Sequence, residues 1–165
     1  MPVTPFHFGP GAALHAVAPK HVSFLAFCAA NVFIDVESLY NLRTDSYPVH
    51  AFFHTYVGAS FVALAIVCLF LAARQLADKI PLPDLFEWRQ LTVTQVSIGA
   101  AAGAYSHVVL DSIMHADITP LAPFSPRNVL LGAMSLDTLH WSCIVAGVLA
   151  LLLLGGRRLM KVREQ

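Results

Sequence analysis

Apolar residues along the chain fall into four long runs that are separated by short, polar, proline-containing segments. The runs cover residues 22–40, 51–73, 91–114 and 129–154. Each reaches the roughly 20 residues that a helix needs to cross the ~30 Å hydrocarbon core of a bilayer. The segments between them have the composition of loops. The pattern therefore predicts an all-α, polytopic membrane protein with four transmembrane helices in one domain, residues 1–165.

A shorter apolar stretch, Phe6 to Ala18, precedes the first run. It contains Gly9-Pro10-Gly11 and is followed by Pro19. As a helix it would be only about 20 Å long, which is too short to span. We therefore expect a short re-entrant or half-depth helix at the N-terminus rather than a fifth span.

Composition agrees with a membrane protein, because 57% of the residues are apolar and 12% are charged. In soluble domains, about 45–50% of the residues are apolar and roughly 25% are charged. The 10 Lys and Arg balance the 10 Asp and Glu, and no basic cluster precedes the C-terminal end, so the features of a nucleic-acid-binding protein are absent. The expected partner is the lipid bilayer, and the sequence leaves the oligomeric state open.

The basic residues are distributed unevenly between the two sets of helix ends. Eight of the ten Lys and Arg lie at one set, and only Arg43 and Arg127 lie at the other. Because cytoplasmic loops carry the excess of Lys and Arg, we expect residues 74–90 and the C-terminus in the cytoplasm. The loops at 41–50 and 115–128 then face outward, together with the N-terminus.

Ionisable side chains, which are costly in a bilayer and usually mark function, gather at four helix ends. These are the end of the first run, the start of the second, the end of the third and the start of the fourth. Consecutive spans alternate in direction, so all four ends meet at one membrane surface, the outer one. The residues are Asp35 and Glu37, then His50 and His54, then His107, Asp111 and His115, and finally Asp137 and His140.

Their spacing points to a metal site. His50 and His54 are four residues apart, as are His107 and Asp111, so each pair would project from one face of a helix. Imidazole nitrogen with carboxylate oxygen is a donor set typical of zinc, or of iron and manganese at higher coordination number. We predict a divalent metal, with zinc preferred, and Asp35 as a further ligand.

Other residues near this site have alternative roles. His115, Asp137 and His140 are possible additional ligands, although Asp137 is favoured as a helix cap or as a partner of His140. Three imidazoles, those of His15, His21 and His140, are favoured as interfacial or hydrogen-bonded residues. Hydrogen bonds that orient the ligands could come from the side chains of Asn31, Thr55 and Ser106.

Two carboxylates are candidates for acid–base chemistry. Glu37 is about 200° round a helix from Asp35, so both can point inward only if the helix ends or unwinds between them. Asp117 follows the third run, where a turn could fold back over the site. Within that run, Gly99-Ala-Ala-Ala-Gly103 predicts a close approach to another helix.

Four short motifs, in this order, give the chain a family resemblance. They are Thr4-Pro5-Phe6-His7, Ile34-Asp35-Val36-Glu37, His50 to His54-Thr55, and Ser106-His107-Val108-Val109-Leu110-Asp111. Together they resemble the YdjM-like family of small bacterial inner-membrane proteins, described as membrane-bound metal-dependent hydrolases. The family pattern runs Thr-His, Pro-Asp-Ile-Asp, His-Arg-Gly-x-Thr-His-Ser and Ser-His-x-x-x-Asp, and its order matches over most of the chain.

The chain departs from this pattern in three of the four motifs. Thr-His is Phe6-His7 here, Pro-Asp-Ile-Asp is Ile34-Asp35-Val36-Glu37, and the histidines of the third motif are one residue closer, with Ala51-Phe52 in place of Arg-Gly. Ser-His-x-x-x-Asp is intact. The resemblance implies a divergent member located in the bacterial inner membrane. The metal positions that it implies are His7, Asp35, Glu37, His50, His54, His107 and Asp111.

The leading functional prediction is a membrane-embedded hydrolase with one or two zinc ions. A metal-activated water would attack an ester or phosphoester, with Glu37 or Asp117 as general base. A site at the outer bilayer surface favours an amphiphilic substrate, a lipid or a lipid-linked phosphate. The alternative is a non-catalytic membrane protein with a structural or transport-related metal site.

Overall fold

The computed structural model describes residues 4–163, and these form helices and connecting segments without a strand among them. The predicted all-helical class is therefore confirmed. Met1, expected on the outer side, lies outside the described residues. The helices are α1 (Thr4–Val17), α2 (Phe24–Arg43), α3 (Tyr56–Ala77), α4 (Val93–Met114) and α5 (Leu136–Arg163), with the short 3-10 helices η1 (Phe52–His54) and η2 (Leu85–Gln90).

Three of the helices are long and apolar enough to cross a membrane, which indicates a membrane protein. They are α2, α3 and the Leu136–Met160 part of α5, with 20, 22 and 25 residues and mean hydropathies of 1.2, 2.4 and 2.0. α4 is as long as α3 but is not among them, and it carries His107 and Asp111. A fourth span at α4 stays a prediction.

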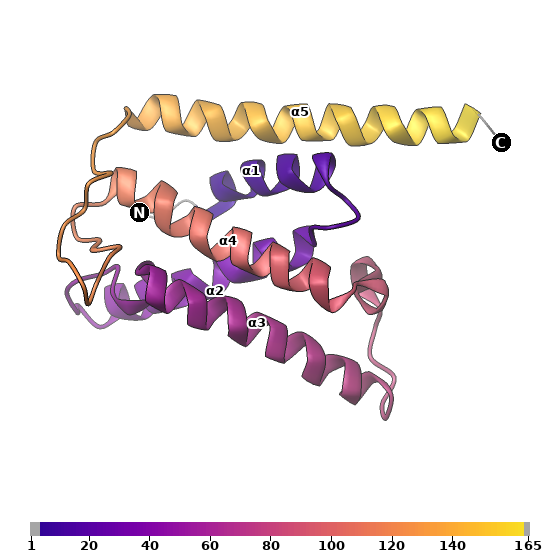
Figure 1. Ribbon diagram of the computed structural model, residues 1–165, viewed down its shortest axis with the longest axis horizontal. Coiled ribbons are helices and arrows are strands. Elements are labelled where there is room, and N and C mark those ends of the chain that lie inside the picture. Colours follow the sequence, from indigo (N-terminus) through magenta and orange to yellow (C-terminus); the bar gives the residue numbers. More distant parts are fainter. Residues whose placement is uncertain (1–3, 164–165) are drawn as a thin grey trace.

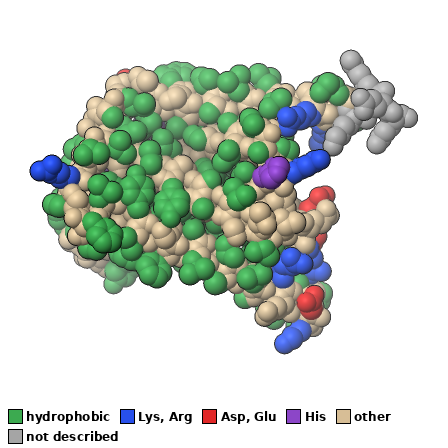
Figure 2. Space-filling view, in the orientation of Figure 1, with side chains coloured by type: hydrophobic (Ala, Val, Ile, Leu, Met, Phe, Trp, Pro, Cys, Tyr) green, Lys and Arg blue, Asp and Glu red, His purple; other side chains and the backbone are tan. Residues whose placement is uncertain are grey.

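The helices lie side by side along the long axis of the molecule (Figure 1). α4 packs against α2 and α3, while α5 rests on α1, which also contacts α2. Residues 44–55 and 115–135 lie together at one end, called the site end here. Residues 78–92 and the C-terminal part of α5 lie at the opposite, basic end, where Lys and Arg side chains gather on the face drawn in Figure 2.

Several element boundaries differ from the sequence predictions. α1 is continuous through Pro10, although the neighbouring glycines predicted an interruption. The second long helix begins at Tyr56 rather than at residue 51, because the Thr55 hydroxyl accepts the Gly58 N–H and caps the helix there.

The fourth long helix begins at Leu136, and residues 129–135 form turns. Gly132 has a φ of 71°, in the left-handed region that a helix excludes. The Ser135 hydroxyl accepts the Thr138 N–H, so Ser135 takes the capping position that was predicted for Asp137. Asp137 lies exposed in the first turn of α5.

Small residues let α4 approach α2 closely, as the spacing of Gly99 and Gly103 predicted. A Cβ atom on Gly103 would lie 2.5 Å from the carbonyl oxygen of Phe27, and one on Gly99 would meet the carbonyl of Ser23. Alanines and β-branched residues of α2, α3 and α4 fill the remaining core, including Ala30, Val62, Val96, Ala100 and Ala104. This contact sets the distance between the helices that carry Asp35 and Asp111.

Replacing Gly103 should therefore destabilise the bundle. We expect Gly103→Ala to lower the free energy of unfolding by about 1–3 kcal/mol, because the backbones must separate. Thermal unfolding of the purified protein in detergent measures the effect. Gly155→Ala is the matched control, because a Cβ atom there meets nothing within 4 Å. Equal unfolding temperatures for the two variants would contradict the close contact.

Candidate metal centre

Four ionisable side chains from three elements converge near the site end. Asp35 comes from α2, His54 from η1, and His107 and Asp111 from α4. One ligand atom from each lies within 4.8 Å of the others. The Nε2 atom of His107 is 3.3 Å from Asp35 Oδ1 and 3.2 Å from Asp111 Oδ2. The Nε2 atom of His54 is 3.8 Å and 3.5 Å from the same two atoms. The structure thus brings together four of the predicted ligands.

The spacing of these atoms fits a tetrahedral metal ion. With metal–ligand distances of about 2.1 Å, the ligand atoms of a tetrahedral site lie about 3.4 Å apart. The four nitrogen–oxygen distances in the group, 3.2–3.8 Å, bracket this value, and the two remaining pairs lie within 4.8 Å. The Nε2 atoms of His54 and His107 and both carboxylate oxygens of Asp111 are buried without a hydrogen bond from any described residue. Such atoms are costly to bury, and a cation would satisfy them. This His/Asp cluster could therefore hold a metal ion.

The imidazole of His107 is held in the orientation that a ligand needs. Asn31 donates its amide hydrogens to the carbonyls of Phe27 and Gly103, so its Oδ1 faces the ring. Oδ1 lies 3.0 Å from His107 Nδ1 and accepts its hydrogen. The Nε2 lone pair is then directed at the carboxylates, which is the orienting role predicted for Asn31.

His7 of α1 lies beside the four-residue group. Its side chain is 2% exposed, with Nε2 3.1 Å from Asp111 Oδ1 and Nδ1 3.2 Å from His107 Nδ1. These contacts connect α1 to α4. His7 thus lies beside the cluster, where the family resemblance places it. Its side chain contacts two other ligand candidates, Asp111 and His107.

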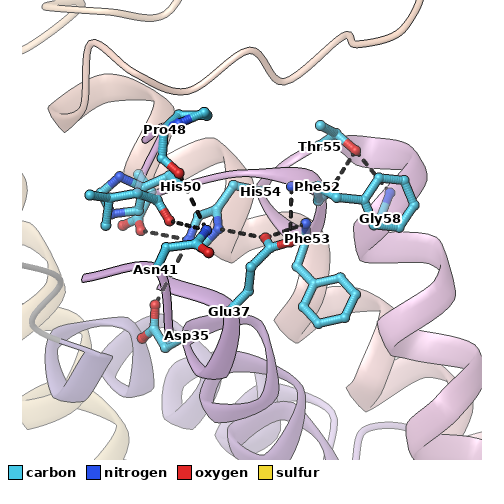
Figure 3. A network of polar contacts seen from close by, with 12 residues as sticks. Asp35, Glu37, Asn41, Pro48, His50, Phe52, Phe53, His54, Thr55 and Gly58 are labelled. Carbon is cyan, nitrogen blue, oxygen red and sulfur yellow. Dashed lines mark hydrogen bonds and ion pairs between the residues drawn. The ribbon is translucent and has the colours of Figure 1, made fainter. Parts of the chain in front are cut away.

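The carboxylate of Glu37 reaches sideways from α2 to η1 (Figure 3). Its oxygens accept the backbone N–H groups of Phe52 at 3.1 Å and Phe53 at 2.6 Å, and Oε2 lies 4.0 Å from His54 Nδ1. α2 is continuous through both Asp35 and Glu37, so the condition under which both carboxylates could point inward is not met. Asp35 faces the cluster, whereas Glu37 holds the backbone that carries His54.

His54 and His50 do not share a helical face, contrary to the prediction from their spacing. His50 precedes η1, and His54 is its last residue. Thr55 holds the turn that carries His54. Its hydroxyl donates to the carbonyl of Phe52 and also caps α3. The tight turn, rather than a helical repeat, brings both imidazoles inward.

Burial lowers the pKa of His54, but the carboxylates of Asp111 and Glu37 outweigh burial and raise this pKa above its ordinary value. The metal-free site therefore favours a protonated His54. A metal ion must displace that proton, so metal binding at this residue should weaken as the pH falls.

A second group of ligand atoms shares Asp111 with the first. The ligand atoms of His50, Asp111 and His115 lie within 4.8 Å of one another. The rings of His50 and His115 stack with centroids 4.1 Å apart. The Nε2 atoms of both are buried without a hydrogen bond from the described residues. Burial and the neighbouring His50 lower the pKa of His115, which keeps its ring neutral and able to bind metal.

Asp117 orients His50, as a turn folding back over the site predicted. Its Oδ1 lies 2.9 Å from His50 Nδ1, and its Oδ2 accepts the backbone N–H groups of Val49 and His50. Burial raises the pKa of Asp117, but these hydrogen bonds from His50 outweigh it and lower the pKa below its ordinary value. Asp117 is therefore an anion that holds the Nδ1–H of His50 and leaves Nε2 directed at the second group.

The other predicted residues lie outside both groups. The Ser106 hydroxyl donates to the carbonyl of Gly103 in its own helix, so the expected bond to a ligand is not formed. His140 stacks on Phe6 with centroids 4.6 Å apart. His15 lies 2.8 Å from the carbonyl of Val22, which is the hydrogen-bonded role predicted for it.

One contributing residue was not predicted. The Asn41 amide donates to the carbonyls of Pro48 and Val49 and so holds the segment that leads into His50 (Figure 3). Its sequence signal is its position four residues after Glu37, on the same face of α2.

The chain matches no protein-family model, no curated protein and no solved structure. The chemistry of the site is therefore inferred from its own geometry.

If the four-residue group binds metal, removing a ligand should lower metal content. We expect His54→Ala, His107→Ala and Asp111→Asn each to reduce the metal retained by the purified protein, measured by elemental analysis. Each variant should also lose thermal stability, because a metal bound only by the folded state stabilises it. His21→Ala, an exposed histidine remote from the cluster, should keep full metal. Full occupancy in both His107→Ala and Asp111→Asn would exclude this site.

Proposed function

We propose that the protein is a membrane-embedded, metal-dependent hydrolase that binds two divalent ions, preferably zinc. The observation that carries this proposal is that two groups of ligand atoms share Asp111. A carboxylate with two oxygens can bridge two ions. Pairs of ions about 3.5–4 Å apart stabilise both the attacking and the leaving oxygen in phosphoester cleavage. We therefore favour a phosphoester substrate.

An opening beside the ligands supports catalysis over a purely structural site. A cavity of about 120 Å³ is lined by His7, His115 and His140 together with apolar side chains. On the other side, a crevice of about 460 Å³ borders His50. Catalytic metal sites keep a coordination position open, whereas structural ones are closed by protein ligands. Water and a substrate group could reach the centre by these routes.

The side chains around the candidate metal centre have separate roles in the proposed reaction. Glu37 and Asp117 were predicted as general bases, but their oxygens accept N–H groups of η1 and of His50. We propose that both carboxylates position ligands. A bound divalent ion would lower the pKa of a water to about 7 and stabilise the negative charge that develops. His7, at the cavity wall, can exchange protons with a group bound there.

The main competing function, ion transport, finds less support. A transport path needs polar side chains at more than one depth of the bilayer. Toward the basic end, the buried polar side chain among the described residues is that of Ser23, whose hydroxyl caps α2, and apolar side chains such as Val62 and Val96 pack between it and the site. The alternative is a closed structural metal site, which would bind metal without cleaving any ester in the activity assay below.

We further propose that α4 crosses the membrane with α2, α3 and α5, giving four spans with α1 at half depth. The packing of α4 between α2 and α3 supports this arrangement. The excess of Lys and Arg at the basic end supports a cytoplasmic C-terminus and an outward-facing site. From the order of its sequence motifs we also propose that the chain is a divergent member of the YdjM-like family, located in the bacterial inner membrane.

The topology can be tested with a reporter enzyme fused to the C-terminus. We expect alkaline phosphatase, which is active only outside the cytoplasm, to be inactive there, because basic loops stay inside. The same reporter inserted after Ala122, in the site-end loop, should be active. The reversed result would overturn the outward-facing site.

The activity can be tested by screening the zinc-loaded protein in detergent against phosphoesters and carboxylic esters. We expect at least one phosphoester to be hydrolysed, and we expect chelation to abolish and zinc to restore the activity. Asp111→Asn should lower kcat/KM by more than about 100-fold, since even residues that only orient ligands contribute roughly 10–100-fold.

His21→Ala should retain full activity, and it controls for losses of activity caused by substitution and purification alone. If the protein retains its metal but cleaves neither class of ester, the hydrolase proposal fails and a structural metal site takes its place.

A further inference from the structure

An apolar groove runs along the contact between α1 and α5. Its volume is about 500 Å³, and its walls include Phe8 and Ala12 of α1 and Val148 and Leu151 of α5. The one imidazole in the described lining belongs to His15, whose Nδ1 lies 2.8 Å from the carbonyl of Val22. The groove therefore suits a hydrocarbon ligand.

The groove adjoins the cavity beside the candidate metal centre. Phe6 and Cys143 line both, and the cavity continues to His7 and His115, which touch or belong to the two ligand groups. One elongated molecule could thus lie with its apolar part between α1 and α5 and its polar end at the cluster.

The length of the groove matches that of a lipid chain. The lining of α5 extends from Cys143 to Leu154, which is about 16 Å along the helix. This is roughly half the ~30 Å hydrocarbon core, the depth of the tails of one leaflet.

Resting on the proposed hydrolase function, we propose that the substrate is a phosphoester carrying a long hydrocarbon chain, and that the α1–α5 groove binds this chain. The phosphoester then lies in the cavity beside His7 and His115. Water adds its oxygen to phosphorus, the P–O bond to the leaving group breaks, and the leaving oxygen takes up the proton released by water. Chain binding in the groove supplies substrate selectivity.

Two substrates with the same leaving group test this proposal: hexadecyl para-nitrophenyl phosphate and methyl para-nitrophenyl phosphate. Val148→Trp and Leu151→Trp fill the groove. Val145→Trp and Leu152→Trp are matched controls on α5 outside the groove lining, because Val145 and Val148 are 51% and 50% exposed and Leu152 and Leu151 are 67% and 70% exposed.

We expect both groove variants to lower kcat/KM for the hexadecyl substrate by about 10-fold or more, equivalent to the loss of roughly two buried methylene groups. The methyl substrate should be unaffected, and the controls should behave as wild type on both. Equal kcat/KM values for the two substrates in the wild type, or groove variants and controls with the same selectivity, would overturn the proposal while leaving the hydrolase intact.

A binding measurement separates this proposal from the hydrolase itself. Hexadecylphosphonate, which cannot be hydrolysed, should raise the unfolding temperature of the wild type and of the controls more than that of the groove variants. If no phosphoester is cleaved but this pattern holds, the groove is supported as a chain-binding site and the hydrolase proposal fails. The same shift in all five proteins would overturn the groove.

Discussion

A fully buried carboxylate constrains the whole site end of this protein. Asp111 has no exposed surface, and a charge in such a position must be surrounded by donors or by a cation. Its oxygens lie 3.1–3.5 Å from the Nε2 atoms of His7, His54 and His107. These imidazoles come from α1, η1 and α4, so one side chain determines how three elements that are distant in sequence meet.

Helix packing and ligand geometry depend on the same contact between α2 and α4. The glycines of α4 allow its backbone to approach α2, and at that contact Asn31 donates to carbonyls of both helices. The remaining oxygen of the amide holds His107. A change in the spacing of these two helices would therefore move a candidate ligand, so the close helix contact and the geometry of the candidate metal centre depend on each other.

The short helix α1 connects the candidate metal centre to the lipid-facing part of the molecule. One of its side chains, His7, contacts Asp111, while its other faces support α5 and form one wall of the apolar groove. Only 17% of the apolar window of α5 is buried within the chain. A helix too short to span a bilayer thus borders both an apolar groove and a buried polar cluster.

Much of the arrangement could be predicted because membrane insertion imposes simple rules. Runs of about 20 apolar residues predict helices, and alternation of direction brings Asp35, His54, His107 and Asp111 to one end whatever the packing details. The family resemblance added His7, whose own spacing carries no signal. Boundaries were predicted less well, because apolar residues at 51–55 and 129–135 continue the hydropathy pattern into turns that Thr55 and Ser135 end by capping.

The sequence by itself determined the helical class, the apolar spans and the set of ionisable residues that meet at one end, because these depend on local composition and on the order of elements. Only the tertiary structure decided which of those residues face one another. Glu37 and Asp117 are carboxylates like Asp35, yet they bind backbone N–H groups and orient histidines, since their roles depend on where η1 and the 115–135 segment fold. Directions of side chains across a helix contact are set by packing distances of a few ångströms, which a one-dimensional pattern does not encode.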